Sequence, residues 1–247
     1  DCVGQILKAA KRAGVETLDT AAGYGSSERA LGRAGVSHFE VITKFGALPD
    51  HITDIKRWVF DQIEGSLDRL NVNILHGCLM HHPDDLLGPH GDSIYEALSD
   101  TKVQGLIQNI GISIYDPEQL DHLMHRFDFN IVQAPMNIFD RRIDSSGWLN
   151  RLKKTNTQVH IRSIFLQGLL LMDPVARPDY FNRWMFMFHD YDAWLARSHM
   201  SALEACTGFV QQFENVQKII IGVASLSQLE SIIEAMSANA MVNAPHD

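Results

Sequence analysis

The sequence contains few cysteines and no long apolar run. Three cysteines occur in 247 residues, at Cys2, Cys78 and Cys206. Their odd number and wide spacing argue against a dense disulfide framework and indicate reduced thiols. No stretch reaches the roughly 18 consecutive apolar residues that a membrane-spanning helix needs, and no signal peptide is recognisable. We therefore expect a cytoplasmic protein without a membrane partner.

Basic residues are also scarce. Lysine and arginine total 21 against 30 aspartates and glutamates, which gives a formal net charge of −9. An acidic chain without a block of basic residues is a poor general nucleic-acid binder, so we expect no nucleic-acid partner. Binding of an anionic cofactor stays open, because it needs only a local cluster of hydrogen-bond donors.

No linker, composition break or low-complexity segment divides the chain, and we expect a single domain over 1–247. The hydrophobic content of 45% is enough to form one large core. Short β-like runs alternate with amphipathic segments, which is typical of a parallel α/β sheet covered by helices. The expected strands are 16–20, 39–44, 72–81, 105–113, 129–134, 159–165 and 218–222. The expected helices are 2–12, 27–32, 52–70, 92–101, one that begins near 116, 143–154, 201–213 and 225–236, with an irregular aromatic stretch over 171–194.

Asp19, Tyr24 and Lys44 lie in one stretch, 18–44, which spans two expected strands. In a parallel α/β barrel the C-terminal ends of the strands converge on one mouth, where these side chains would meet. A free tyrosine has a pKa of about 10. A nearby lysine cation favours the phenolate and lowers that pKa, and a buried aspartate keeps the lysine charged. Such a tyrosine can protonate a developing alkoxide or take the proton back, which is the chemistry of reversible carbonyl reduction.

The run DTAAGYGSSE (19–28) resembles the D-T-A-x-x-Y-G-x-S-E signature of the aldo-keto reductases. Members of that family are (β/α)8 barrels that reduce carbonyls with NADPH through an Asp/Tyr/Lys/His tetrad. The resemblance implies a tetrad of Asp19, Tyr24, Lys44 and His81. The segment LMHHP (79–83) is similar to the family's L-I-H-W-P strand end, where His81 would orient the substrate carbonyl; His82 replaces the usual tryptophan.

The resemblance implies a (β/α)8 TIM barrel, but the first expected element here is a helix. Such a barrel begins with a strand and closes its sheet on itself, and a sheet that lacks one strand exposes two edges. We therefore expect a barrel whose first strand is absent from this sequence, with further residues before Asp1 in the native protein.

Later segments resemble those that hold the cofactor in this family. IGIS (110–113) and VQAPMN (132–137) resemble strands that bind the nicotinamide carboxamide. RSIFLQGLL (162–170) resembles the segment that passes under the cofactor pyrophosphate. GVASLSQL (222–229) resembles the loop that receives the adenosine 2′-phosphate. Arg162 is either a ligand-binding or a structural cation. The cofactor-binding candidates are Ser113, Gln133, Ser163, Phe165, Gln167, Gly168, Gly222, Ser225 and Gln228.

The sequence departs from the family pattern at several of these positions. Ile114 stands where an asparagine is expected, which removes one amide contact. Gln228 stands where many members carry arginine, and Ser231 and Ile232 replace an expected Glu and Asn. A bidentate arginine binds a phosphate most strongly, so its absence weakens the preference for NADPH over NADH. The family resemblance implies NADP(H) as the cofactor, and NAD(H) stays open.

The sequence thus indicates an oxidoreductase that reduces an aldehyde or ketone, and its partner is a small-molecule carbonyl or alcohol. The sequence of the segment 162–170, RSxFLQGLL, resembles that of bacterial family members associated with sugar or polysaccharide pathways. This resemblance favours a sugar-like carbonyl as the substrate. Aromatic residues of 171–194 are candidates for a substrate wall. The oligomeric state, monomer or dimer, stays open.

Two other functions stay open: a reductase-like nucleotide-binding regulatory subunit with little turnover, and a metal-dependent barrel hydrolase. The histidines His76, His81 and His82 suggest a metal site and therefore the hydrolase. Adjacent residues of a strand face opposite sides, however, as do residues five apart, and no thiol or carboxylate completes a good ligand set. We therefore expect no metal site.

Overall fold

A computed structural model describes residues 2–238 and 242–244; residues 1, 239–241 and 245–247 of the expected 1–247 domain lie outside the described part. Seven strands form one parallel sheet in which each strand pairs with the next in the chain. They are β1 (Thr17–Asp19), β2 (Glu40–Phe45), β3 (Leu75–Met80), β4 (Ile107–Ser113), β5 (Ile131–Pro135), β6 (Gln158–Arg162) and β7 (Lys218–Ile219). The parallel α/β sheet predicted from the sequence is confirmed.

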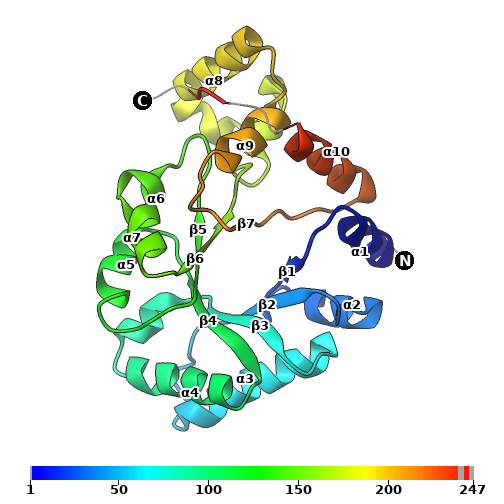
Figure 1. Ribbon diagram of the computed structural model, residues 1–247. Helices are drawn as coiled ribbons and strands as arrows, with labels where there is room; N and C mark the ends of the chain where they lie inside the picture. Colours follow the sequence, from blue (N-terminus) through cyan, green and yellow to red (C-terminus); the bar gives the residue numbers. More distant parts are fainter. Residues whose placement is uncertain (1, 239–241, 245–247) are drawn as a thin grey trace.

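The sheet curls, and the helices lie around its outer side (Figure 1). This is the arrangement that right-handed crossovers between parallel strands produce. The helices are α1 (Cys2–Arg12), α2 (Ser27–Ala34), α3 (Ile55–Leu70), α4 (Gly91–Val103), α5 (Glu118–Leu123), α6 (Arg142–Ser145), α7 (Trp148–Lys154), α8 (Met185–Ser198), α9 (Ala202–Gln211) and α10 (Leu226–Ser237). Across 2–238 and 242–244, none is long and apolar enough to cross a membrane.

The two ends of the sheet, β1 and β7, share no backbone ladder in the described part of the chain, and side chains join them instead. Lys218 of β7 places Nζ 3.3 Å from Glu16 Oε2 and 3.5 Å from Glu40 Oε2. Outside the sheet, Ala10 of α1 packs in one apolar cluster with Leu229 of α10. The first and last strands are therefore held together by an ion-pair cluster and by their flanking helices.

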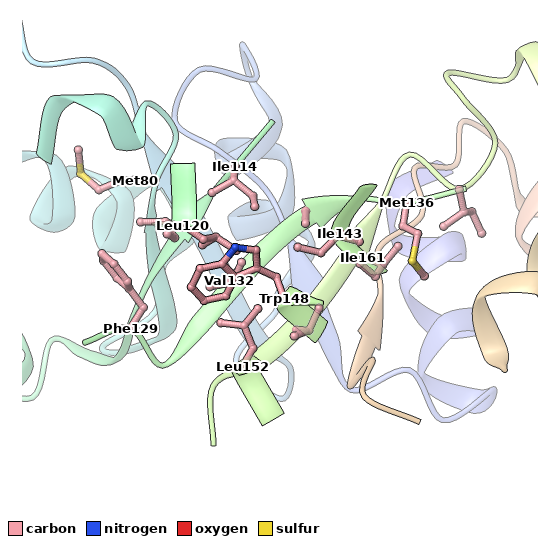
Figure 2. Packing of buried hydrophobic residues seen from close by; sticks show 14 of the residues in the cluster. Met80, Ile114, Leu120, Phe129, Val132, Met136, Ile143, Trp148, Leu152 and Ile161 are labelled. Atoms are coloured by element: carbon pink, nitrogen blue, oxygen red, sulfur yellow. The ribbon is translucent and has the colours of Figure 1, made fainter. Parts of the chain in front are cut away.

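Two apolar layers fill the fold. Ile42, Leu79 and Ile131 form a fully buried cluster of their own on the concave side of the sheet. The outward-facing strand residues pack against the helices. Figure 2 shows part of this outer layer: Met80, Ile114, Leu120, Phe129, Val132, Met136, Ile143, Trp148, Leu152 and Ile161. Burial of both faces explains why these strands read as nearly continuous apolar runs.

Glu28 of α2 is buried, although its place in the sequence suggests only an acid at a helix N-terminus. Its Oε1 accepts a hydrogen bond from Thr43 Oγ1 at 2.6 Å, and its Oε2 accepts one from Arg69 Nε at 2.6 Å. Because a buried carboxylate is costly without partners, these two bonds tie α2 to β2 and to α3. Thr43 directly precedes Lys44, so the tie also fixes the end of β2.

Two predicted boundaries are wrong because the backbone takes a left-handed turn. The expected helix 143–154 is split into α6 and α7 at Gly147, whose φ of 78° no residue of a regular helix adopts. The expected strand 159–165 ends at Arg162, because Ser163 has a φ of 61°.

The stretch 171–194 is more regular than predicted. It contains two short 3-10 helices, η3 (Pro174–Ala176) and η4 (Asp179–Trp184), and the first ten residues of α8 lie within it. Phe188, Tyr191 and Trp194 are buried in the main core. Their burial against neighbouring elements supplies a helix-stabilising face that local propensity does not reveal.

Two helical glycines offer a matched test of this packing. A Cβ at Gly32 of α2 would lie 2.3 Å from the backbone oxygen of Arg69, whereas a Cβ at Gly4 of α1 would meet nothing within 4 Å. We expect Gly32→Ala to lower the free energy of unfolding by about 1–3 kcal/mol, and Gly4→Ala to raise it by up to about 1 kcal/mol. Urea unfolding followed by circular dichroism measures both, and shifts of the same sign would contradict the close approach of α2 and α3.

Candidate active site

Three of the four residues in the expected tetrad lie at the C-terminal ends of consecutive strands. Asp19 is the last residue of β1, Lys44 is next to last in β2, and His81 directly follows β3. The Lys44 side chain is fully buried; its Nζ lies 2.5 Å from Asp19 Oδ1 and donates to Thr20 O at 3.0 Å. The carboxyl ends of parallel strands thus bring a cation and an anion together away from water.

Asp19 is held from a third strand as well. Its Oδ2 accepts a hydrogen bond from Gln133 Nε2 of β5 at 2.8 Å. Gln133 is almost fully buried, and it was expected to hold a nicotinamide carboxamide. In the structure one of its amide protons positions Asp19, and the side-chain oxygen and second proton stay free for a ligand.

Tyr24 lies in the loop after β1, and its ring faces both Lys44 and His81. The Lys44 Nζ is 5.3 Å from the centroid of the Tyr24 ring. The rings of Tyr24 and His81 meet edge to face, with centroids 5.8 Å apart and planes 76° apart. About half of the Tyr24 surface is exposed, so the phenol can reach a ligand while Lys44 lies buried behind it.

The pKa of the Tyr24 phenol is raised, opposite to the predicted direction. Burial is the largest cause, the Asp19 carboxylate adds to it, and the Arg162 guanidinium opposes it. The lowering that the sequence predicts from Lys44 is not among the causes of this shift. The cation that favours the phenolate is Arg162.

The pKa values of two further residues of the tetrad, His81 and Lys44, are lowered. Burial is the main reason that the pKa of His81 is lowered, and the Lys44 cation lowers it further. Burial also lowers the pKa of Lys44, and the charge of Asp19 opposes this effect. A neutral imidazole at His81 is therefore favoured at neutral pH.

A cavity of about 910 Å³ opens beside these residues. It reaches from the strand ends to the N-terminal turns of α10. Its lining includes Asp19, Tyr24, His81, Tyr115, Gln133, Arg162, Ser163, Phe165, Gln167, Gly168, Leu171, Leu203, Gly222, Ser227, Gln228, Ser231 and Ile232. The lining contains most of the residues that the sequence proposes for catalysis and cofactor binding. Lys44, Ser113 and Ser225 are the candidates that do not line it.

The loop from Ser163 to Gly168 forms a strained part of the wall. Ser163, Leu166 and Gln167 have φ angles of 61°, 46° and 57°, and Gly168 has 88°. Asn137 Nδ2 donates to Ser163 O at 3.1 Å and helps to hold the first of these turns. Non-glycine residues rarely adopt this conformation, and where they do it often marks a functional site.

The N-terminus of α10 forms the far end of the cavity. Ser225 Oγ accepts from Gln228 N at 3.2 Å and lies 3.0 Å from Ser227 Oγ, so Ser225 caps the helix rather than facing the cavity. Gln228 Oε1 accepts from Ala224 N at 2.8 Å. Ser227 and Ser231 supply the hydroxyls of this end.

The structure adds Tyr115, which directly follows the IGISI run, to the candidates. Arg162, for which the sequence left a ligand-binding and a structural role open, lines the cavity. The aromatic residues of 171–194 do not line the cavity, so the predicted aromatic wall is wrong; Leu171 and Leu203 stand there. In the part of the chain that the structure describes, no three His, Cys, Asp or Glu side chains cluster as metal ligands would.

The model of the Aldo/keto reductase family matches residues 2–243. The chain is 26% identical over 153 residues to the aldo-keto reductase YhdN of Bacillus subtilis, which covers 58% of this chain and 46% of that protein. It is 28% identical over 158 residues to a 6-dehydroglucose reductase of Novosphingobium aromaticivorans, covering 57% of this chain and 50% of that protein. The chain spans about half the length of these curated relatives.

Solved structures share the fold. The holo form of an aldo-keto reductase from Bacillus halodurans matches with a TM-score of 0.75 at 20% identity, over 94% of this chain and 80% of that one. A thermostable aldo-keto reductase solved with the inhibitor epalrestat gives 0.72 at 20% identity, over 95% and 81%. These likenesses show the curled α/β architecture of the (β/α)8 barrel. Together with the family match over nearly all its length, they establish that the chain belongs to the aldo/keto reductase family.

Proposed function

We propose that this protein is an NAD(P)H-dependent oxidoreductase that reduces an aldehyde or ketone, and that it oxidises the alcohol in the reverse direction. One observation carries the proposal. The buried Lys44–Asp19 ion pair lies behind the half-exposed Tyr24 ring, which meets His81 in the wall of a large cavity. Membership of the family supports carbonyl reduction in general.

In this proposal Tyr24 is the general acid and His81 orients the carbonyl. The raised pKa of Tyr24 keeps its phenol protonated at neutral pH, ready to give a proton to the carbonyl oxygen as negative charge develops there. A neutral His81 donates one ring N–H to the same oxygen. Lys44 and Asp19 are positioning residues that fix the floor of the site behind the Tyr24 ring.

The size of the cavity supports the proposal of a nicotinamide dinucleotide as its ligand. Its volume lies toward the upper end of the roughly 300–1,000 Å³ that ligand sites occupy. Ser113 Oγ is buried without a hydrogen-bond partner among the described residues, and Ser113 pairs in register with Gln133. A buried hydroxyl without a partner needs an explanation, and a carboxamide held by Ser113 and Gln133 supplies one. When bound, the nicotinamide supplies the hydride that the carbonyl carbon receives.

The strained loop provides donors for the phosphates. The backbone amides of Phe165 and Gln167 have no acceptor in the described part of the protein, and both residues line the cavity. Amides presented by successive tight turns form concave anion sites. We propose that these amides bind the pyrophosphate with the Ser163 hydroxyl, and that Ser227 and Gln228 receive the adenosine end.

The substrate that we propose is a small, sugar-like carbonyl compound. The relative from Novosphingobium aromaticivorans is named a 6-dehydroglucose reductase, and the RSIFLQGLL segment resembles bacterial members of sugar pathways. The polar side chains of His81, Tyr115 and Arg162 around Tyr24 suit a hydroxylated molecule.

The role of Tyr24 is tested by Tyr24→Phe. We expect kcat for reduction of 4-nitrobenzaldehyde to fall by about 10²–10⁴, because the proton donor is lost, while the Kd for NADPH changes less than about threefold. The matched control is Tyr180→Phe, a more exposed tyrosine outside the cavity, which should keep full activity. Wild-type protein that binds NADPH and forms no alcohol would instead indicate a nucleotide-binding subunit.

The pH dependence of reduction follows from the raised pKa of Tyr24. The phenol must be protonated to act as the acid, and it loses its proton only as pH rises through that pKa, above about 10. We expect kcat/KM for the aldehyde to stay level between about pH 7 and 9 and to fall above about 10, with the protein still folded by circular dichroism. A fall of kcat/KM centred near pH 7–8 would contradict the raised pKa and show that Lys44 lowers the pKa of Tyr24.

Cofactor preference depends on the absence of an arginine at 228. We expect the Kd values of NADPH and NADH to differ by less than about tenfold. Gln228→Arg should strengthen NADPH binding by about tenfold or more and leave NADH binding unchanged, because a guanidinium can pair with the 2′-phosphate. Gln228→Lys, a compact charge without the planar fork, should give a smaller gain. Equal gains for both nucleotides would place the 2′-phosphate elsewhere.

A further inference from the structure

Arg162 is a half-buried guanidinium that forms no ion pair with any residue that the structure describes. It is the last residue of β6 and lines the cavity. Its Nη2 donates to Ile114 O at 2.9 Å, and its Nη1 lies 3.3 Å from Ser163 Oγ. No carboxylate of the described residues forms an ion pair with it, although the chain carries an excess of acids. Its remaining N–H groups are free to bind a ligand.

Two other enclosed arginines of the fold are paired with carboxylates. Arg177 is nearly fully buried and binds Asp192 through both terminal nitrogens at 2.7 and 2.6 Å. Arg69 donates to Glu28 at 2.6 Å. A partly desolvated cation is costly without an anion, so the unpaired state of Arg162 in a cavity wall points to an anion supplied from outside the chain.

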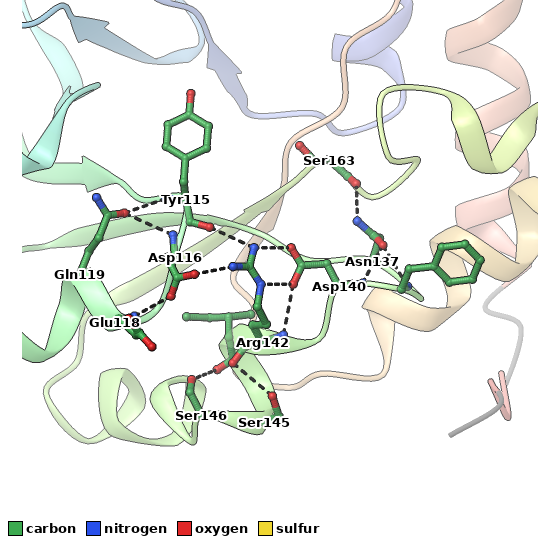
Figure 3. A network of polar contacts seen from close by, with 12 residues as sticks. Tyr115, Asp116, Glu118, Gln119, Asn137, Asp140, Arg142, Ser145, Ser146 and Ser163 are labelled. Atoms are coloured by element: carbon green, nitrogen blue, oxygen red, sulfur yellow. Dashed lines mark hydrogen bonds and ion pairs between the residues drawn. The ribbon is translucent and has the colours of Figure 1, made fainter. Parts of the chain in front are cut away.

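The surrounding structure holds the guanidinium in place. Its Cζ lies 4.6 Å from the centroid of the Tyr115 ring. Tyr115 is anchored through its backbone oxygen, which accepts from Arg142 Nη2 at 3.2 Å, and Arg142 is itself clamped between Asp116 at 2.5 Å and Asp140 at 2.9 Å. Figure 3 shows this network, with the Tyr115 ring projecting away from it. Arg162 is therefore pre-oriented, which reduces the entropy lost on binding.

Arg162 and Tyr115 flank the proposed proton donor rather than the α10 end of the cavity. Both line the cavity together with Tyr24 and His81, and the charge of Arg162 acts on Tyr24, His81 and Lys44. An anion bound by Arg162 therefore lies close to the reacting carbonyl. The phosphate donors that we propose at the adenosine end, Ser227 and Gln228, belong to another part of the wall.

We propose that Arg162, braced by Tyr115, determines substrate specificity by binding a carboxylate on the carbonyl compound, so that oxo acids and aldehydic acids, including sugar acids, are preferred over neutral aldehydes. The inference rests on the proposed function and names its substrate class. The planar fork of a guanidinium matches a carboxylate through two parallel hydrogen bonds. The Tyr115 ring lies against one face of that fork and helps to hold its orientation.

The test compares two aldehydes of equal length, succinic semialdehyde and butanal. For the wild type we expect kcat/KM to favour the carboxylate substrate by about 10- to 100-fold, which corresponds to a charge-assisted pair. Arg162→Gln should remove most of this preference, by raising KM for succinic semialdehyde much more than KM for butanal. Arg162→Lys should restore part of it. Arg151→Gln is the control, because Arg151 also stacks on an aromatic ring, at 4.8 Å from Trp148, but lies outside the cavity.

Three results would overturn the inference. One is a wild-type preference near unity. Another is a preference that survives in Arg162→Gln. The third is an equal loss for both aldehydes together with weaker NADPH binding, which would assign the guanidinium to a phosphate of the cofactor.

Calorimetry with 4-hydroxybutyrate and 1-butanol separates the inference from the proposed function, because it needs no turnover. Binding of the acid that is lost in Arg162→Gln supports the anion site even if neither aldehyde is reduced. No binding of the acid to the wild type contradicts it even if butanal is reduced.

Discussion

The buried ion pair between Lys44 and Asp19 is the constraint on which the candidate site depends. Desolvating two charges costs several kcal/mol for each ion and is recovered only with good geometry and further hydrogen bonds. Both are present: Lys44 also donates to Thr20 O, and Asp19 also accepts from Gln133. The pair thereby joins the ends of β1, β2 and β5, and losing either partner would leave a buried charge uncompensated. Tyr24 packs over this fixed floor.

Another part of the cavity wall is formed by the loop 163–168, whose backbone is strained. Ser163, Leu166 and Gln167 keep left-handed backbone conformations, each of which costs of the order of 1–3 kcal/mol. Turn hydrogen bonds from Leu166 N and from Asn137 to Ser163 O hold them. The result is a loop that lines the cavity and whose Phe165 and Gln167 amides have no acceptor in the described part of the protein. Next to it lies the Arg162 guanidinium, which forms no ion pair with any described residue. The site thus has a rigid, net-neutral ion pair on one side and hydrogen-bond donors suited to an anion on the other.

Much of this could be predicted from the sequence, because strand ends and signature residues are local features. The alternation of strands and helices, and the convergence of Asp19, Tyr24 and His81 on one cavity, follow from patterns within short segments. What failed depended on tertiary context. A left-handed Gly147 split one helix, burial of Phe188 and Tyr191 ordered α8, and Arg162 rather than Lys44 is the cation that favours the Tyr24 phenolate. The Arg162–Tyr115 contact joins residues distant in sequence, so no local pattern could reveal it.

Isotope transfer tests the central claim, carbonyl reduction at Tyr24, most directly. The full chain would be incubated with 4-nitrobenzaldehyde and NADPH carrying deuterium in both hydrogen positions of nicotinamide C4, and the alcohol analysed by mass spectrometry. The account predicts one deuterium on the carbinol carbon, formed at a rate that depends on Tyr24. Oxidised cofactor without deuterated alcohol, or no consumption of cofactor at all, would contradict it.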